Sequence, residues 1–410
     1  MNKKISFSIA LIFSAFVAKT QNLEYARNCV NELTSKKYNG RGYVKDGSNR
    51  AASFLFDEFL KYATDEPYYQ SFTFPVNTFP NKMKVAVNGK KLVPGQDYII
   101  GTACPSIKGE FKICRIDKSN YNTIPTDLKN QFVLFDTSGS NGEIDKEFIK
   151  RFQLAHKTAG YIQLEEKKLT WSVNSVQKFP VVYILRNALP VNASKINLQV
   201  DAELINYTAK NVIGHVEGKI ADTCIFITAH YDHLGQMGKK TYFPGGNDNA
   251  SGTSMLLNLM QYFAKKENQP PYTLVFIAFA GEEAGLLGSE YYTNHPSKDL
   301  NKIKFLLNLD LMGTGDDGIM VVNGSVFEKE FSLMEKINSE QQLLKTVGKR
   351  GKAQNSDHYY FTEKGVPSFF LYTTGGRTAY HDIYDDGPGL PLTKFKEVFT
   401  LISTFIKTIN

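Results

Sequence analysis

Two adjacent glutamates, Glu282 and Glu283, stand at the end of an apolar run from Thr273 to Phe279, flanked only by alanine and glycine. Such a run is typical of a strand in the middle of a sheet. Two carboxylates held close together in a protein interior repel each other and lose their hydration. The pair therefore lies in water on a loop or faces a bound cation, and the rest of the sequence decides between the two.

Histidine and aspartate side chains follow other apolar runs in the same manner. His230 and Asp232 come directly after "IFITA", and Asp310 directly follows "FLLNL". His381 lies in the loop after "FFLYTTG", and Asp248 lies in the glycine-rich "PGGNDNASG" just ahead of a helical pattern. Each signal is weak alone, because aspartate also favours turns and helix caps. A metal-competent side chain after each strand favours a metal site over a solvated surface.

The donor types indicate which metal this site would take. Imidazole nitrogen and carboxylate oxygen without thiolate suit Zn²⁺, and less often Mn²⁺ or Co²⁺. Five ligands exceed what one open catalytic zinc needs, but they fit two ions if one carboxylate bridges and a water lies between the metals. Two-metal hydrolytic sites of this kind hold the attacking and leaving oxygens together. The five candidate ligands are His230, Asp248, Glu283, Asp310 and His381.

The elements that must position these residues alternate between strand and helix from about residue 205. Continuous apolar runs predict buried strands at 223–230, 272–281, 304–313 and 366–375. Helical patterns occupy 251–266, 326–341 and 393–409. We therefore expect an α/β fold whose mixed, largely parallel central sheet is covered by helices on both faces. In such a sheet, functional residues gather beyond the carboxyl ends of the strands.

The middle of the chain has a different pattern. Residues 85–204 hold short β-like pieces separated by turn residues, which predicts a β-rich insert. Residues 21–84, with the helical "NRAASFLFDEFLKYA", would belong with residues 205–410 in one discontinuous domain. Because the insert contributes none of the candidate ligands, we expect it to be dispensable for chemistry and to shape substrate access.

The first residues have the form of a secretory signal peptide, which we place at 1–20. They predict a secreted or periplasmic protein without a membrane anchor after cleavage. The formal charge of +7 includes three lysines of this segment, which leaves 7 − 3 = +4. No basic stripe is apparent, so neither a nucleic-acid nor a membrane partner is expected. Four cysteines allow three disulfide connectivities, with Cys104 and Cys114 the best candidates.

Five motifs, in order along residues 205–410, resemble those of the co-catalytic zinc exopeptidases that include secreted bacterial leucine aminopeptidases and aminopeptidase Y. They read "AHYDHLG", "GGNDNASGTS", "FAGEEAGLLGS", "NLDLMG" and "YHDIYDD". The resemblance implies two Zn²⁺ ions, with Asp248 bridging them after a cis peptide bond to Asn249. It also implies that residues 85–204 are similar to a protease-associated domain.

The resemblance further assigns a role to each site residue. His230 would bind one zinc, with Asp232 orienting its other ring nitrogen. Glu282 would be the general base. Glu283 would be a ligand, and Asp310 and His381 would bind the second zinc.

Four further residues are interpreted less specifically. His233 is expected to support the site by hydrogen bonding. Asp357, in "NSDHYYF", would touch substrate or cap a helix, and Tyr380 would stabilise an oxyanion or simply pack. Arg377 departs from the family pattern, in which another histidine is frequent, and this puts substrate contacts in doubt more than metal binding.

The sequence thus predicts an exported two-zinc aminopeptidase acting on peptides or proteins, with Glu282 as general base. Three alternatives stay open at this point. A glutaminyl cyclase would use a single zinc, a carboxypeptidase would belong to the same family, and a binding protein on an inactive scaffold would have lost its activity. The cleaved residue and the oligomeric state are not predicted.

Overall fold

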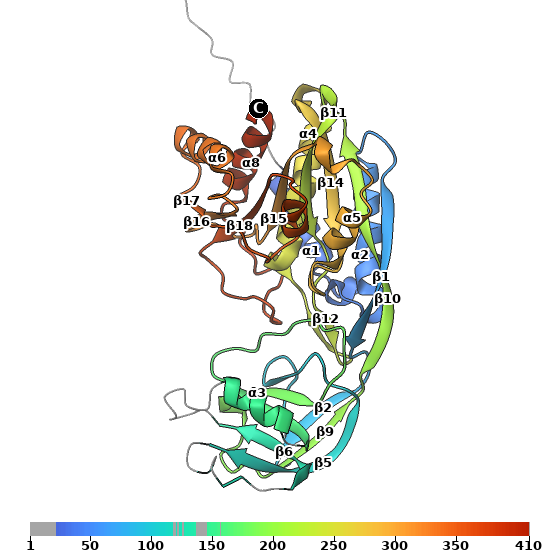
Figure 1. Cartoon of the computed structure of the whole chain (residues 1–410), viewed down its shortest axis with the longest axis vertical. Coiled ribbons are helices and arrows are strands. Elements are labelled where there is room, and N and C mark those ends of the chain that lie inside the picture. The colour runs from blue at the N-terminus through green and yellow to red at the C-terminus, as the bar shows by residue number, and fades with distance from the viewer. Residues whose placement is uncertain are drawn as a thin grey trace, which may run out of the picture.

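The computed structural model describes residues 22–117, 120, 123–124, 127–136, 146–155 and 157–409. The predicted signal peptide, residues 1–20, lies outside these residues. Two eight-stranded sheets form two lobes, one above the other in Figure 1. We call them the central sheet, in the upper lobe, and the second sheet, in the lower lobe. No helix of the described residues is long and apolar enough to cross a membrane.

The central sheet runs in the order β1-β10-β14-β11-β15-β18-β16-β17. Four of its seven neighbouring pairs are parallel, including the consecutive strands β14, β11, β15 and β18. The bounds are β1 Tyr68–Thr78, β10 Glu203–Val216, β11 Ile220–His230, β14 Tyr272–Phe279, β15 Ile303–Asp310, β16 Gly318–Val322, β17 Val347–Lys349 and β18 Ser368–Thr374. All four predicted buried strands are present, and the expected mixed, largely parallel sheet is confirmed.

Helices cover both faces of the central sheet because side chains alternate along each strand. Ile225 and Ile227 of β11 pack on one helical layer, whereas Phe226 packs on the other. The first layer contains α1 Leu23–Leu33, α2 Gly47–Leu60, α4 Gly252–Phe263, α6 Glu328–Gln341 and α8 Phe395–Thr408. The second contains α5 Leu287–Asn294 and α7 His358–Glu363. The predicted fold class is confirmed.

The second sheet runs in the order β3-β2-β9-β5-β6-β7-β8-β4. Its bounds are β2 Met83–Val87, β3 Lys90–Lys91, β4 Tyr98–Ile100, β5 Ile107–Ile116, β6 Leu128–Phe135, β7 Thr158–Glu165, β8 Val181–Leu185 and β9 Lys195–Val200, with helix α3 Lys146–Ala155. The long antiparallel strands β1 and β10 run along one side of the molecule and connect the lobes in Figure 1. The β-rich region is thus a sheet, while its division from the rest as an inserted domain stays a prediction.

The expected disulfide between Cys104 and Cys114 is wrong, because all four cysteines are free. The two residues pack on opposite faces of the second sheet. Cys104 belongs to the core that contains Phe132, whereas Cys114 packs against the core that contains Val133. Proximity along the chain was misleading, because Cys114 lies on β5 whereas Cys104 lies in the loop before β5 and packs on the other face of the sheet.

Candidate active site

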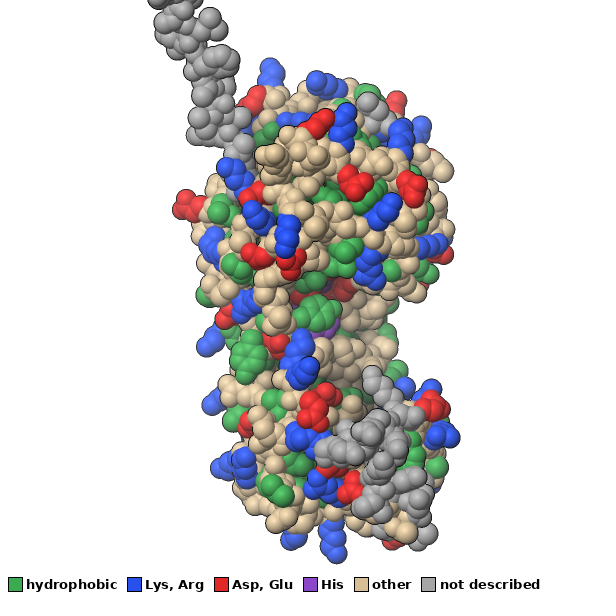
Figure 2. All heavy atoms as spheres, turned by 90° about the vertical axis from the view of Figure 1, so that its left-hand side faces the viewer, with side chains coloured by type: hydrophobic (Ala, Val, Ile, Leu, Met, Phe, Trp, Pro, Cys, Tyr) green, Lys and Arg blue, Asp and Glu red, His purple; other side chains and the backbone are tan. Residues whose placement is uncertain are grey.

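The predicted site residues meet at the carboxyl ends of the central strands. His230 and Asp310 are the last residues of β11 and β15, and Glu283 follows β14 after a short turn. Asp248 lies in the helical turn η4 (Gly246–Ser251) ahead of α4, and His381 lies in the loop after β18. Figure 2 shows histidine and acidic side chains together at the narrow waist between the lobes.

The first group of donor atoms contains His230. Its Nε2 lies 3.4 Å from Asp248 Oδ1 and 3.4 Å from Asp310 Oδ2. Its other ring nitrogen, Nδ1, lies 3.2 Å from the backbone carbonyl oxygen of Asp232. Since a carbonyl can only accept, Nδ1 carries a proton, and Nε2 is the ring nitrogen that faces the two carboxylates.

The second group contains His381. Its Nε2 lies 3.0 Å from Asp248 Oδ2 and 3.3 Å from Glu283 Oε2. Its Nδ1 donates to the backbone carbonyl of Trp171 at 3.0 Å. The two oxygens of Asp248 therefore face two different imidazoles. Asp310 is paired with His230 rather than with His381, which differs from the expected sharing of one ion by Asp310 and His381.

The separations within both groups fit zinc coordination. Two ligand atoms bound at the usual 2.0–2.2 Å to a tetrahedral zinc lie about 3.3 Å apart. In addition, Asp310 Oδ1 is buried without a hydrogen-bond partner among the described residues. The donor set of imidazole and carboxylate, with this unpaired buried oxygen, fits a pair of zinc ions.

The same side chains allow another grouping within 4.8 Å, in which Glu282 joins His230 and Asp310, and His233 joins Asp248 and Glu283. His233 Nδ1 lies only 2.7 Å from Glu283 Oε1. That is a hydrogen-bond distance and is short for two ligands of one tetrahedral zinc. We therefore favour the two groups around Asp248, in which His233 holds Glu283 in place.

The concentration of buried carboxylates in the site also favours binding of a cation. Burial and neighbouring carboxylates raise the pKa of Glu282 well above its usual range, and burial raises the pKa of Asp310. Burial also acts to raise the pKa of Asp248, but hydrogen bonds from His230 and His381 outweigh it and hold this pKa well below its usual range. A divalent cation would make these close carboxylates tolerable.

Arg41 lies in the same region, but it does not neutralise these carboxylates directly. Burial lowers the pKa of its guanidinium to about 10. Its hydrogen bonds to described residues go to the backbone carbonyls of Leu33, Tyr231, Pro244, Gly245 and Asp248. Arg41 therefore fixes the backbone beneath the site, a role that its position in the sequence did not reveal.

A glycine conformation directs the two glutamates. Gly281 has a φ of +71°, which favours glycine, and its hypothetical Cβ would meet nothing closer than 3.4 Å. The positive φ therefore requires glycine at the turn after β14, whereas the surrounding atoms would leave room for a side-chain Cβ. Asp232 Oδ1 accepts the backbone N–H of Glu282 at 3.2 Å. The Asp232 carboxylate therefore holds Glu282 in place, while it lies 3.8 Å from the Nδ1 of His230 that it was expected to orient.

Three further residues hold candidate ligands or their neighbours in place, and the sequence analysis did not identify them. Asp385 accepts the backbone N–H groups of Asn247 and Asp248 at 2.8 and 3.0 Å, and so holds the loop that carries Asp248. Tyr43 donates its hydroxyl to Asp232 at 2.8 Å. The third residue is Trp171, whose carbonyl accepts from His381. Asp385 lies in the quoted motif "YHDIYDD", whereas nothing in the sequence links the other two to the site.

The structure also describes the Asp248–Asn249 peptide bond and the residues Asp357, Tyr380 and Arg377. The peptide bond from Asp248 to Asn249 is cis, which confirms that expectation. Asp357 is buried and makes no helix-capping hydrogen bond, and burial raises its pKa to about 7. Tyr380 stacks on the imidazole of His381 with ring centroids 4.0 Å apart. Arg377 bonds to backbone and carboxylate oxygens of its own loop.

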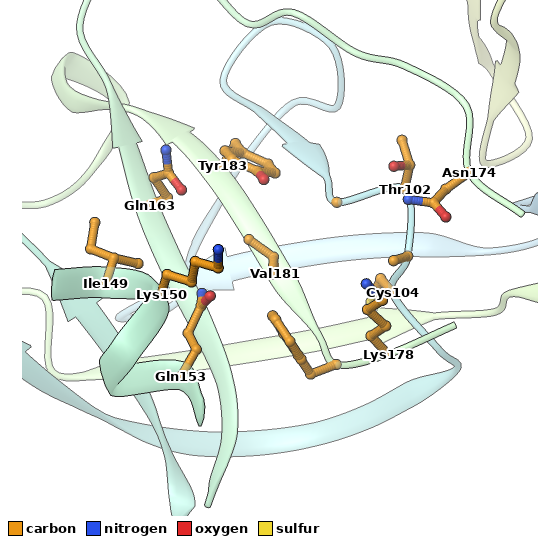
Figure 3. A pocket seen from close by; sticks show the side chains of 13 residues that line it. Thr102, Cys104, Ile149, Lys150, Gln153, Gln163, Asn174, Lys178, Val181 and Tyr183 are labelled. Carbon is orange, nitrogen blue, oxygen red and sulfur yellow. The ribbon is translucent and has the colours of Figure 1, made fainter. Parts of the chain in front are cut away.

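A separate cavity of about 350 Å³ lies in the second sheet (Figure 3). Lys150 and Gln163 line one side of it, and Asn174 and Lys178 line the other. Among the described residues that line it there is no carboxylate or imidazole, and burial raises the pKa of the Cys104 thiol to about 12, which keeps this thiol protonated. The cavity therefore lacks the donors of a zinc site.

Known relatives match a part of this chain. Aminopeptidase YwaD of Bacillus subtilis (strain 168) is 33% identical over 174 residues, which are 40% of this chain and 35% of the relative. A probable leucine aminopeptidase of Trichophyton verrucosum is 31% identical over 223 residues, 51% of this chain and 54% of the relative. The aligned stretches thus span about a third to a half of these relatives.

Solved structures share the fold over nearly the whole chain. BSAP, a zinc aminopeptidase from Bacillus subtilis, matches with a TM-score of 0.72 and 20% identity, covering 93% of this chain and 94% of that one. An aminopeptidase from Aneurinibacillus sp. strain AM-1 matches with a TM-score of 0.67 and 20% identity, covering 95% and 94%. The sequence model of Peptidase family M28 matches residues 211–406, which hold all of the candidate ligands. Over these 196 residues, just under half of its length, the chain is similar to peptidase family M28.

Proposed function

We propose that this protein is an exported aminopeptidase that uses two zinc ions to hydrolyse N-terminal peptide bonds. The observation that carries the proposal is the position of Asp248, whose two oxygens face two separate imidazole–carboxylate pairs. The names of the relatives, aminopeptidase and leucine aminopeptidase, support the reaction class. Export rests on the signal-like pattern of residues 1–20.

The ligands divide into two sets that share Asp248. His230 and Asp310 would complete the first set, and Glu283 and His381 the second. When bound, the ions would lower the pKa of a water and polarise the scissile carbonyl. Two sets favour a two-metal peptidase over the single-zinc glutaminyl cyclase, and a complete donor set argues against an inactive binding protein.

Glu282 is the residue that would move the proton. It accepts a proton from the attacking water and delivers it to the leaving amine, as a general base and then a general acid. Burial raises its pKa, which favours the protonated form once Glu282 has taken the proton from water. Asp232 supports this role by holding the backbone N–H of Glu282.

Metal removal is expected to abolish the activity reversibly. The purified protein should hydrolyse leucine p-nitroanilide, lose this activity after dialysis against a chelator, and regain it fully after addition of two equivalents of zinc. A parallel assay with an N-blocked peptide tests the carboxypeptidase alternative, and an N-terminal glutaminyl peptide tests the cyclase. Recovery at one equivalent, or turnover of only the blocked or glutaminyl substrate, would contradict the proposal.

Trp171→Gly is expected to weaken zinc binding, although Trp171 belongs to the second lobe. The indole stacks on Phe243 at 4.6 Å and donates to the carbonyl of Ile100 at 2.8 Å, and so fixes the backbone that orients His381. Loss of such a supporting hydrogen bond usually costs 10–100-fold in metal affinity. We would measure zinc affinity by competition with a chelating dye.

Trp171→Phe is the matched control, because it keeps an aromatic ring against Phe243. It should bind zinc more tightly than Trp171→Gly. Equal zinc affinity in the original protein and in a folded Trp171→Gly variant would show that the second lobe does not support the site. The original expectation that residues 85–204 are dispensable would then stand.

A further inference from the structure

Five lysines that are scattered in the sequence surround one cleft of about 460 Å³. The cleft lies where the second sheet meets the small hairpin of β12 (Gly235–Met237) and β13 (Thr241–Phe243). The lysines come from β2 and its approach, from β3, and from the turn of the hairpin. They are Lys82, Lys84, Lys91, Lys239 and Lys240. None of the described residues that line the cleft is acidic.

The positive charge of this cleft is uncompensated by nearby side chains. All five lysines are exposed, and none forms a salt bridge with another described residue. Outside its first 21 residues, the chain has an excess charge of 7 − 3 = +4. Five exposed lysines around one cleft make this part of the surface locally positive.

Three acidic side chains of neighbouring segments have hydrogen-bond partners other than the five lysines. Asp97 accepts the backbone N–H of Val93, and Glu203 accepts a hydrogen bond from Asn81. Asp386, in the loop after His381, is paired with Arg377 at 3.0 Å. Because none of the five lysines pairs with a described carboxylate, they are available to carboxylates from outside the chain.

The floor of the cleft is apolar. Met83, Pro94 and Met237 line it between the lysines, and Met237 is fully buried. Methionine adapts to ligands of varied shape, since its side chain is flexible and polarisable. The combination of an apolar floor with a ring of ammonium groups suits carboxylates that are interspersed with apolar side chains.

The cleft adjoins the loop that carries the candidate zinc ligand His381. A Cβ on Gly95 would lie 2.8 Å from Ile383 and 2.9 Å from Thr241, so these three residues pack together. Thr241 lines the cleft, and Ile383 is two residues from His381. An extended peptide advances about 3.3 Å per residue. Residues of a peptide substrate beyond the cleaved bond can therefore extend from the loop of His381 toward the cleft.

We propose that this cleft binds acidic residues of peptide substrates on the C-terminal side of the cleaved bond. The proposal rests on the proposed aminopeptidase function and adds a preference for acidic peptides. An acidic peptide is favoured over an anionic membrane because the site is a bounded cleft beside the loop of His381.

Kinetics with paired peptides test this preference. Two series of peptides begin with leucine and carry either Asp and Glu or Asn and Gln further along. At low salt, kcat/KM should be about tenfold higher for the acidic series, because steering by local charge raises association rates by 10–10³-fold. The preference should vanish in the variant Lys82→Glu/Lys239→Glu/Lys240→Glu, while turnover of leucine p-nitroanilide stays unchanged.

The matched control changes three exposed lysines outside the cleft. The variant Lys329→Glu/Lys364→Glu/Lys396→Glu carries the same change in net charge and should keep the preference. Cleavage of both series at equal kcat/KM by the original protein would overturn this inference and leave the proposed function intact. Failure to cleave any peptide would instead overturn the proposed function.

Binding without turnover provides an independent readout. A fluorescent, N-acetylated acidic peptide should bind the original protein and the control variant, but not the cleft variant, as measured by anisotropy. Vesicles of anionic phospholipid form the second arm of the experiment. Binding of these vesicles without binding of the peptide would overturn the inference in favour of a membrane surface.

Discussion

Glu282→Gln is expected to lower kcat by about 10²–10⁴-fold while the protein keeps its full zinc content. Glutamine has nearly the same shape as glutamate, but it cannot take a proton from water. Glu283→Gln is expected to behave differently, because Glu283 Oε2 faces His381 in the second set of donors. This variant should lose zinc, and its activity should fall as a consequence.

The two variants should be compared by zinc content and by kcat on the same preparations. Glu267→Gln, on an exposed segment, is the control for the loss of one carboxylate. The alternative grouping places Glu282 with His230 and Asp310 as a ligand. Loss of zinc from Glu282→Gln, with normal zinc in Glu283→Gln, would establish that alternative and refute our assignment.

Asp248→Asn is expected to reduce zinc content below one ion per chain and to lower activity by ~10²-fold or more. Asp248 is the only proposed ligand shared by both sets, and an asparagine amide offers one neutral oxygen and no second acceptor. Loss of a supporting residue alone costs 10–100-fold in metal affinity, so loss of a direct ligand to two ions should cost more.

Asp222→Asn provides the control for Asp248→Asn, since Asp222 is exposed on strand β11. It should keep its zinc and its activity. A folded Asp248→Asn variant that retains two zinc ions would mean that Asp248 does not bridge them. Circular dichroism of both variants establishes that they are folded.

The elements that carry the site could be predicted because their signals are local. The apolar runs that became β11, β14, β15 and β18 are continuous, as buried parallel strands require. A metal-competent residue at or after each run then falls at one edge of the sheet. For this reason, the sequence alone brought together His230, Asp248, Glu283, Asp310 and His381.

The partners of these residues could not be predicted, because they depend on contacts between distant parts of the chain. Trp171 and His381 are 210 residues apart, and Tyr43 and Asp232 are 189 apart. The pairing of Asp310 with His230 also depends on the direction of their side chains, which the spacing of apolar residues in the sequence does not determine. The lysine cleft was missed for the same reason, since its members form no basic stripe along the sequence.

The central claim is that two zinc ions lie on opposite oxygens of Asp248. Anomalous diffraction from crystals of the zinc-loaded protein, recorded on both sides of the zinc absorption edge, tests it most directly. We predict two peaks, one beside His230 and Asp310 and the other beside Glu283 and His381, with Asp248 between them. A single peak, or two peaks that do not share Asp248, would contradict the account.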